Sequence, residues 1–183
     1  MRIKGTFFKD YVKIVLDSPE LDWGRFLTEA DWGVVRGAMI IPTQWYPAET
    51  MGHIGRGIFE LRVNKNYAAV RLHGRARATE SFDAATMKFL NKGDALGAIR
   101  TYVTIAARFI DEVKVSVDGG GAGHAEVCFH PVDNVPSWDL FREIQAGTME
   151  KLAELNGAIE ARAEFVKAER DGREACIIRV EWK

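Results

Sequence analysis

The chain has 183 residues, of which 47% are hydrophobic and 28% charged, with 25 basic and 26 acidic side chains. This length predicts one domain over residues 1–183, large enough to bury a core without disulfides or metals. The apolar fraction excludes a disordered tail. The near-neutral charge argues against a dedicated nucleic-acid-binding protein, which normally carries a basic excess. Because two cysteines cannot form a disulfide framework, we expect a reducing, cytoplasmic location.

The N-terminal segment begins with basic residues, as a signal peptide does. However, Lys9, Asp10 and Lys13 interrupt its apolar positions, and no cleavage site of small residues follows. No stretch of the chain approaches the ~20 apolar residues that span a bilayer. We therefore expect neither a signal peptide nor a membrane span.

Apolar residues at spacings of three and four predict helices in the first part of the chain. Phe8, Val12 and Val15 form one such stripe, on a first helix that ends before Ser18. A short second helix is expected over residues 19–27, where Pro19 suits the first turn.

Further helix starts carry their own signals. Thr28 and Asp31 resemble a capping box with an acid in place of the usual Glu or Gln, and Pro42 is expected to stop the helix that they open. Pro47 begins another helix. A less regular helical region covers residues 65–90, and a very regular helix follows from residue 94.

In the second part of the chain, apolar and polar residues alternate, which predicts two β-hairpins. The first spans residues 113–129 around the glycine-rich turn 118–123, and the second spans residues 158–182. Ser137 caps a long helix between them that ends at Asn156. The expected fold is α+β: a helical N-terminal part followed by β-β-α-β-β with a four-stranded antiparallel sheet.

Four side chains that commonly bind metals alternate along one predicted strand: His124, Glu126, Cys128 and His130. Alternation places them on one strand face. Because alternate residues are about 6.6 Å apart, the two histidines are about 20 Å apart and cannot share one ion. A metal would need one neighbouring pair and a residue of another strand. The alternative is a polar sheet face or a subunit contact.

A basic stretch runs from Arg56 to Arg77, with six basic residues and one acid, Glu60. On a helix, Arg71 and Arg75 share a face, which suits a phosphate, a carboxylate or an acidic patch of a partner. The alternative is a solvated face that pairs with the chain's own acids. Because stacking aromatics are not interleaved, nucleic acid is not an expected partner.

Four aromatic residues are candidates for lining an apolar ligand cavity together with these arginines: Trp45, Tyr46, Phe59 and Tyr102. The alternative is that they only fill the core. Motifs of activated nucleophiles are absent, so we expect no catalytic residues. The leading hypothesis is a non-enzymatic domain that binds a small ligand or a partner protein. A metal-dependent enzyme that uses the His124, Glu126, Cys128 and His130 face is the alternative.

Several segments carry a resemblance to a known superfamily. They are Trp45 to Pro47 before a helix, Ala95 to Phe109 before the first hairpin, Gly147 and Gly157 around the late helix, and Ile177 to Trp182 as a final strand. Together they resemble 4-vinyl-reductase-type ligand-binding domains. That superfamily also contains haem–nitric-oxide-binding domains and TRAPP vesicle-tethering subunits. Within it, the chain is most similar to an uncharacterised myxobacterial family.

The resemblance implies a sensory or scaffolding domain, expected as a homodimer, and leaves the cofactor unknown. The zinc-type cysteine pairs of some members are missing, because Cys128 and Cys176 stand alone. The Tyr-x-Ser-x-Arg signature of haem-binding members is also missing, and the sequence from Leu72 to Arg75 does not replace it. His53 and His73 therefore do not carry over as haem ligands.

Overall fold

A computed structural model describes residues 1–37, 39–81, 93–111, 113–129, 137–170 and 173–183. The chain groups into two compact units. The helical unit comprises Met1–Asn66, Phe109–Glu112 and Val132–Leu140, and the sheet unit comprises Tyr67–Arg108, Val113–Pro131 and Phe141–Lys183. The expectation of a single domain stays a prediction. Among the described helices, none has the length and apolarity needed to cross a membrane.

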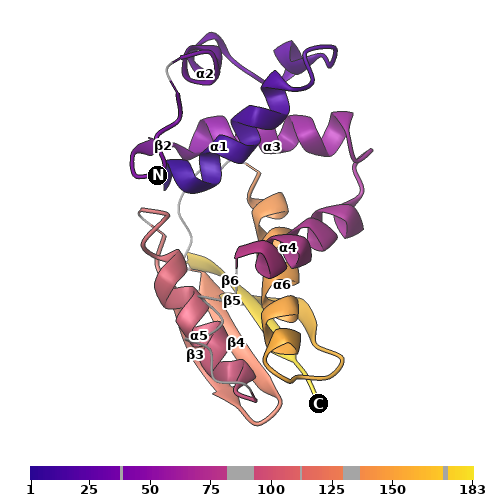
Figure 1. The fold of residues 1–183 in the computed structure, drawn as a ribbon. Helices are drawn as coiled ribbons and strands as arrows, with labels where there is room; N and C mark the ends of the chain where they lie inside the picture. Colours follow the sequence, from indigo (N-terminus) through magenta and orange to yellow (C-terminus); the bar gives the residue numbers. More distant parts are fainter. Residues whose placement is uncertain (38, 82–92, 112, 130–136, 171–172) are drawn as a thin grey trace. The chain divides into compact units, whose positions relative to one another are not determined.

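The helical unit contains three α-helices, one 3₁₀ helix and a two-stranded ribbon among its described residues (Figure 1). They are β1 (Arg2–Lys4), α1 (Gly5–Leu16), the 3₁₀ helix η1 (Trp23–Arg25), α2 (Glu29–Val35), β2 (Trp45–Pro47) and α3 (Ala48–Leu61). The predicted end of α1 and start of α3 are confirmed. The helix expected over residues 19–27 is wrong in length, because only η1 is helical. The helix from Thr28 stops at Val35 rather than near Pro42.

The capping box is confirmed, and it explains where α2 begins. The Asp31 backbone N–H donates to the Thr28 hydroxyl oxygen at 3.2 Å, and the Thr28 backbone N–H donates to the Asp31 carboxylate at 2.8 Å. These two bonds satisfy helix N–H groups that have no partner within the helix.

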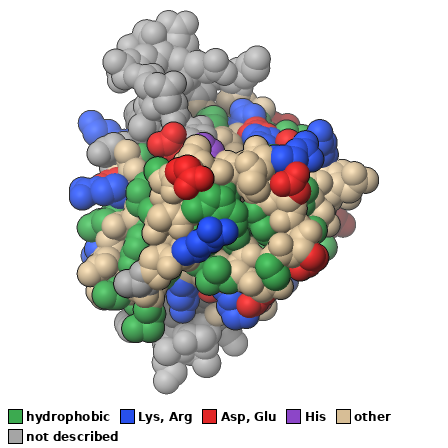
Figure 2. Space-filling model, turned by 90° about the horizontal axis from the view of Figure 1, so that it is seen from above, with side chains coloured by type: hydrophobic (Ala, Val, Ile, Leu, Met, Phe, Trp, Pro, Cys, Tyr) green, Lys and Arg blue, Asp and Glu red, His purple; other side chains and the backbone are tan. Residues whose placement is uncertain are grey.

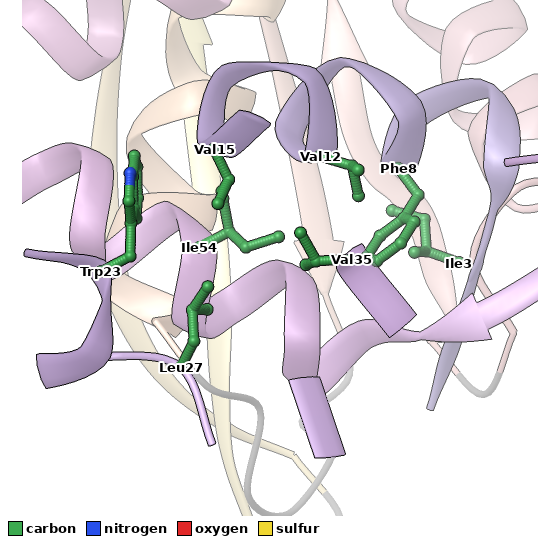
Figure 3. Close-up of a cluster of buried hydrophobic side chains, with 8 residues drawn as sticks. All are labelled: Ile3, Phe8, Val12, Val15, Trp23, Leu27, Val35 and Ile54. Carbon is green, nitrogen blue, oxygen red and sulfur yellow. The ribbon is translucent and has the colours of Figure 1, made fainter. Parts of the chain in front are cut away.

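The core of the helical unit lies between α1, α2 and α3 (Figure 3). It consists of Ile3, Phe8, Val12, Val15, Trp23, Leu27, Val35 and Ile54. Phe8, Val12 and Val15 are the stripe predicted from the spacing of apolar residues. Ile3 joins them because β1 pairs with β2 in antiparallel register, with Ile3 opposite Tyr46 and Lys4 opposite Trp45. This ribbon was not predicted from the sequence.

The sheet unit holds the remaining elements (Figure 1). They are α4 (Tyr67–Ser81), α5 (Ala95–Ala106), β3 (Val115–Gly121), β4 (His124–Phe129), α6 (Trp138–Leu155, from Phe141 onward in this unit), β5 (Arg162–Arg170) and β6 (Arg173–Glu181). The sheet has the order β3-β4-β6-β5, and all neighbours are antiparallel. The predicted α+β fold with a four-stranded antiparallel sheet is confirmed. Residues 82–90 of the predicted helical region lie outside the described residues.

The sheet turns one apolar face to α5 and α6. Val127, Ile178 and Val180 are fully buried on that face. The ring of Phe129 on β4 meets that of Phe141 on α6 edge-to-face, with centroids 5.6 Å apart. Cys128 lies opposite Ile177 and Cys176 opposite Phe129, so the two cysteines point to opposite faces of the sheet and are not placed for a disulfide.

The surface is mixed in character. Figure 2 shows one face of the molecule, on which hydrophobic side chains reach the surface among Lys, Arg, Asp and Glu side chains. Exposed large hydrophobic residues occur in both units, namely Leu16, Met39, Ile41, Trp45, Tyr67, Leu72, Ile105 and Ile159. Scattered apolar residues of this kind are normal on protein surfaces.

Candidate functional site

The close crossing of α4 and α6 organises the charged centre of the sheet unit. A Cβ atom at Gly74 would lie 2.2 Å from the Ile144 carbonyl oxygen, and one at Gly147 would lie 2.0 Å from the Arg71 carbonyl oxygen. The Thr148 hydroxyl donates to the Gly74 carbonyl at 3.1 Å. The two backbones therefore approach as closely as only glycine allows.

This crossing sets the two predicted arginines of α4 against acids of α6. Arg75 donates to Glu150 at 3.1 Å and to both Glu154 oxygens at 2.7 Å. Hydrogen bonding to Glu154 is the largest cause of the raised pKa of Arg75, and burial acts against it. Arg75 therefore pairs with the chain's own acids, which is the second of the two interpretations of the basic stretch.

Arg71 is held differently. Its Nη2 donates to the Ala163 carbonyl at 2.5 Å, while its Nε lies 3.5 Å from Glu150 and 3.7 Å from Glu143. Glu150 also accepts from the Ala163 backbone N–H at 2.9 Å. β5 is an edge strand of the sheet, so the backbone N–H and C=O of Ala163 have no neighbouring strand to pair with on that side. Glu150 accepts from this N–H, and Arg71 donates to this C=O.

The acids of α6 were missed from the sequence, although a signal was present. Glu143, Glu150 and Glu154 recur at intervals of seven and four, which places them on one helix face. Arg71 and Arg75 are likewise four residues apart. Matching the acidic face to the basic face would have predicted this helix pair.

Tyr102 lies on α5 in the same unit. Its hydroxyl donates to the Gln145 side-chain oxygen on α6 at 2.7 Å. Burial raises the pKa of Tyr102 to about 12, against the opposing effect of hydrogen bonds with Gln145 and Thr148. The phenol therefore stays neutral and ties α5 to α6.

The other three aromatic candidates belong to the helical unit. Trp45 is 36% exposed, with the Lys4 ammonium 4.0 Å from its ring centre. Tyr46 stacks on Phe8 with centroids 5.0 Å apart, and Phe59 is buried. The six predicted ligand-binding residues are thus divided between the two units, three in each.

The predicted metal-binding face is a polar face of the sheet near the hairpin tip. His124 is exposed, and Cys128 is fully buried against Val166 and Ile177. Glu126 accepts from the Nε and Nη2 of Arg179 at 2.9 and 2.8 Å. Within the described residues, no group of three or more His, Cys, Asp or Glu side chains is placed to hold a metal ion. His130 lies outside the described residues.

A buried carboxylate in the helical unit was recognised from sequence only as a cap. Asp31 is 3% exposed, and its Oδ2 accepts from the Thr28 hydroxyl at 2.7 Å and lies 2.8 Å from His53 Nδ1. Burial alone would raise the pKa of Asp31, but hydrogen bonds from Thr50, Thr28 and His53 outweigh it and lower the pKa to about 2.

Because the pKa of Asp31 is lowered in the folded state, the free energy of folding depends on pH. The ordinary Asp pKa is 3.8, so Asp31 stabilises the fold above that pH and loses its contribution as the pH falls through about 2. We expect Asp31→Asn to lower the free energy of unfolding by about 2 kcal/mol at neutral pH and by much less at about pH 2. Urea unfolding of both proteins over this pH range measures the difference. A difference that stays constant with pH would contradict the assignment.

Comparison with known proteins identifies the fold of the chain by its similarity to solved structures. No family model matches the chain, and neither does any curated protein. Among solved structures, a point mutant of an H-NOX protein from T. tengcongensis matches at 16% identity and a TM-score of 0.62, over 99% of this chain and 98% of that chain. A Cs H-NOX mutant matches at 16% identity and a TM-score of 0.62, over 99% of this chain and 97% of that chain.

An Fe(II) unliganded H-NOX protein from K. algicida matches at 13% identity and a TM-score of 0.59, over 99% of this chain and 97% of that chain. The chain therefore has the H-NOX fold, the fold of haem–nitric-oxide-binding domains, along its whole length. This confirms the part of the predicted resemblance that named these domains. The vinyl-reductase, TRAPP and myxobacterial parts stay predictions.

Proposed function

We propose that this chain is a non-enzymatic sensory domain that has the H-NOX fold and binds a small ligand other than haem. The observation that carries the proposal is the match over 99% of the chain to H-NOX domains of solved structure. A fold by itself does not fix a ligand, so the residues of this chain decide which ligand is proposed.

The described histidines, Cys128 and Tyr102 are not placed as axial ligands of a haem. A haem iron needs an axial side chain, usually His and otherwise Cys, Met or Tyr, inside a shielded pocket. His73 and His124 are exposed, and half-buried His53 is bound to Asp31. Cys128 is enclosed by Val166 and Ile177. Tyr102 is hydrogen-bonded to Gln145.

The enzyme alternative has less support. Its proposed face contains Glu126, which is held by Arg179, and this pair continues to Glu164 at 3.4 Å. A row of cross-strand ion pairs is typical of a solvated sheet face. The homodimer, the cytoplasmic location and a partner protein that receives the signal are further parts of the proposal, and all three can be tested separately.

A haem titration tests the proposal. We expect the purified chain, mixed with haemin or with reduced haem, to show no stoichiometric Soret band after gel filtration. An H-NOX domain of known structure serves as the positive control. A Soret band that elutes with the chain at one haem per chain would overturn the haem-independent proposal. Native mass spectrometry of the same sample identifies a retained small ligand by its mass.

A further inference from the structure

Arg142 on α6 differs from the other arginines at the crossing of α4 and α6. Its guanidinium carbon lies 5.2 Å from the ring centre of Phe165 on β5. In the described part of the chain it has no ion-pair partner, and its Nε is buried without a hydrogen-bond acceptor. A buried charged donor that has no acceptor destabilises the fold, so such a donor calls for an explanation.

Arg71 approaches the same ring from α4. Its guanidinium carbon is 5.9 Å from the centre of Phe165, and its Nε is also buried without a hydrogen-bond acceptor. The bond from Nη2 to Ala163 holds the group in place. The nearest carboxylates, at 3.5 and 3.7 Å, are ion-pair partners beyond ordinary hydrogen-bond distance. Two guanidinium groups with unsatisfied Nε donors therefore lie against one aromatic ring.

Among the described residues, the charged side chains at the crossing of α4 and α6 include one more cation than carboxylates. The cations are Arg71, Arg75, Arg142 and Lys151, and the carboxylates are Glu143, Glu150 and Glu154. Glu150 and Glu154 are engaged by Arg75, by Lys151 and by the Ala163 N–H. Glu143 lies 3.7 Å from Arg71 Nε and is also attracted by the charge of its chain neighbour Arg142. Burial raises its pKa, and the attraction of the two arginines only partly offsets this.

We propose that Arg142 and Arg71, set against the ring of Phe165, bind one oxyanion, a carboxylate or phosphate group of a small ligand, and that Glu143 competes with it. Guanidinium groups bind both kinds of oxyanion with paired N–H donors, and an aromatic ring is a frequent support for them. The inference names the chemical class of the ligand in the proposed function. It rests on that function only for the signalling role of the ligand, because the binding itself is measured directly.

The test is calorimetric titration of the full chain with sodium phosphate and, separately, with sodium succinate, at constant ionic strength. We expect saturable 1:1 binding of at least one of them, and the two titrations tell phosphate recognition from carboxylate recognition. Arg142→Gln is expected to weaken binding at least tenfold, since it removes a charge-assisted pair of donors. Glu143→Gln is expected to tighten it severalfold, because it removes the competing carboxylate.

Arg162→Gln is the matched control. Arg162 is exposed on the same strand as Phe165 but on the opposite face of the sheet, so its loss should leave the affinity unchanged. Absence of saturable binding of both anions would overturn the proposal, and so would equal affinities of the Arg142 and Arg162 variants. Glu143→Gln keeps the test decisive if Arg142→Gln does not fold. A haem-binding result in the earlier experiment would overturn the proposed function and leave this measurement unaffected.

Discussion

Gly147→Ala is expected to lower the free energy of unfolding by about 3 kcal/mol, a large effect for a single added methyl group. The new Cβ would lie 2.0 Å from the Arg71 carbonyl oxygen, which belongs to the backbone of α4 and has no rotamer to move to. The two helices must then separate, and the hydrogen bond from Thr148 to Gly74 lengthens with them. Urea denaturation followed by circular dichroism measures the change.

Gly55→Ala provides the matched control. Gly55 also lies inside a helix, α3, but its added Cβ would meet only the Tyr11 ring, at an ordinary 3.8 Å. Because alanine favours helices over glycine, this variant should gain about 0.5–1 kcal/mol. If Gly147→Ala were as stable as Gly55→Ala, the close contact of α4 with α6 would be refuted.

Glu150→Ala is expected to cost a similar amount, about 3 kcal/mol. Glu150 is buried and serves three groups: Arg71, Arg75 and the Ala163 backbone N–H. Removing it leaves Arg71 with one distant carboxylate, Glu143, and leaves the edge of β5 without an acceptor. Thermal and urea unfolding would both show the loss.

Two further variants show why the loss of Glu150 is destabilising. Glu150→Gln keeps an acceptor for the Ala163 N–H and should therefore cost less than Glu150→Ala. Glu164→Ala removes an ion pair with Arg179 in which Glu164 is mostly exposed, and should change stability by less than about 1 kcal/mol. A loss at Glu150 no larger than the loss at Glu164 would contradict the role assigned to the buried carboxylate.

The elements that the sequence predicted well are those whose signals are local. The start of α5 follows from Asp94, whose side chain accepts from the Gly97 N–H. The start of α2 follows from Thr28 and Asp31. In both cases the cap and the helix lie within a few residues, so the interaction that fixes the boundary is visible in the sequence itself.

Long-range pairing was not visible in the same way. β1 is three residues long and pairs with β2 more than 40 residues away. A strand this short shows too little alternation to be separated from the helix that follows it. The helix expected to reach Pro42 ends instead at Val35. Met39, which was expected to extend the apolar stripe of that helix, is 85% exposed.

The candidate site was predicted only in part, because several of its contacts also join residues that are far apart in the sequence. Helix spacing placed Arg71 and Arg75 on one face, but the acids that meet them depend on how α4 crosses α6. Arg142 carries no local signal at all, since its position against Phe165 results from the packing of α6 beside β5. Gly74 and Gly147 allow that crossing. A glycine within a helix can have several roles, so the sequence alone does not show which element packs against it.

The way in which the helical unit is assembled limits where the chain can be cut. Residues 109–111 return to its first strand: Lys4 N–H donates to the Phe109 carbonyl, Asp111 N–H donates to the Arg2 carbonyl, and the rings of Phe7 and Phe109 meet edge-to-face. A fragment that stops at residue 66 would keep most of the core and lose this closing segment. During synthesis, these bonds of β1 can form only after more than 100 further residues have been made. Closing so long a loop slows folding. Proteins prepared for the experiments above should therefore contain the whole chain.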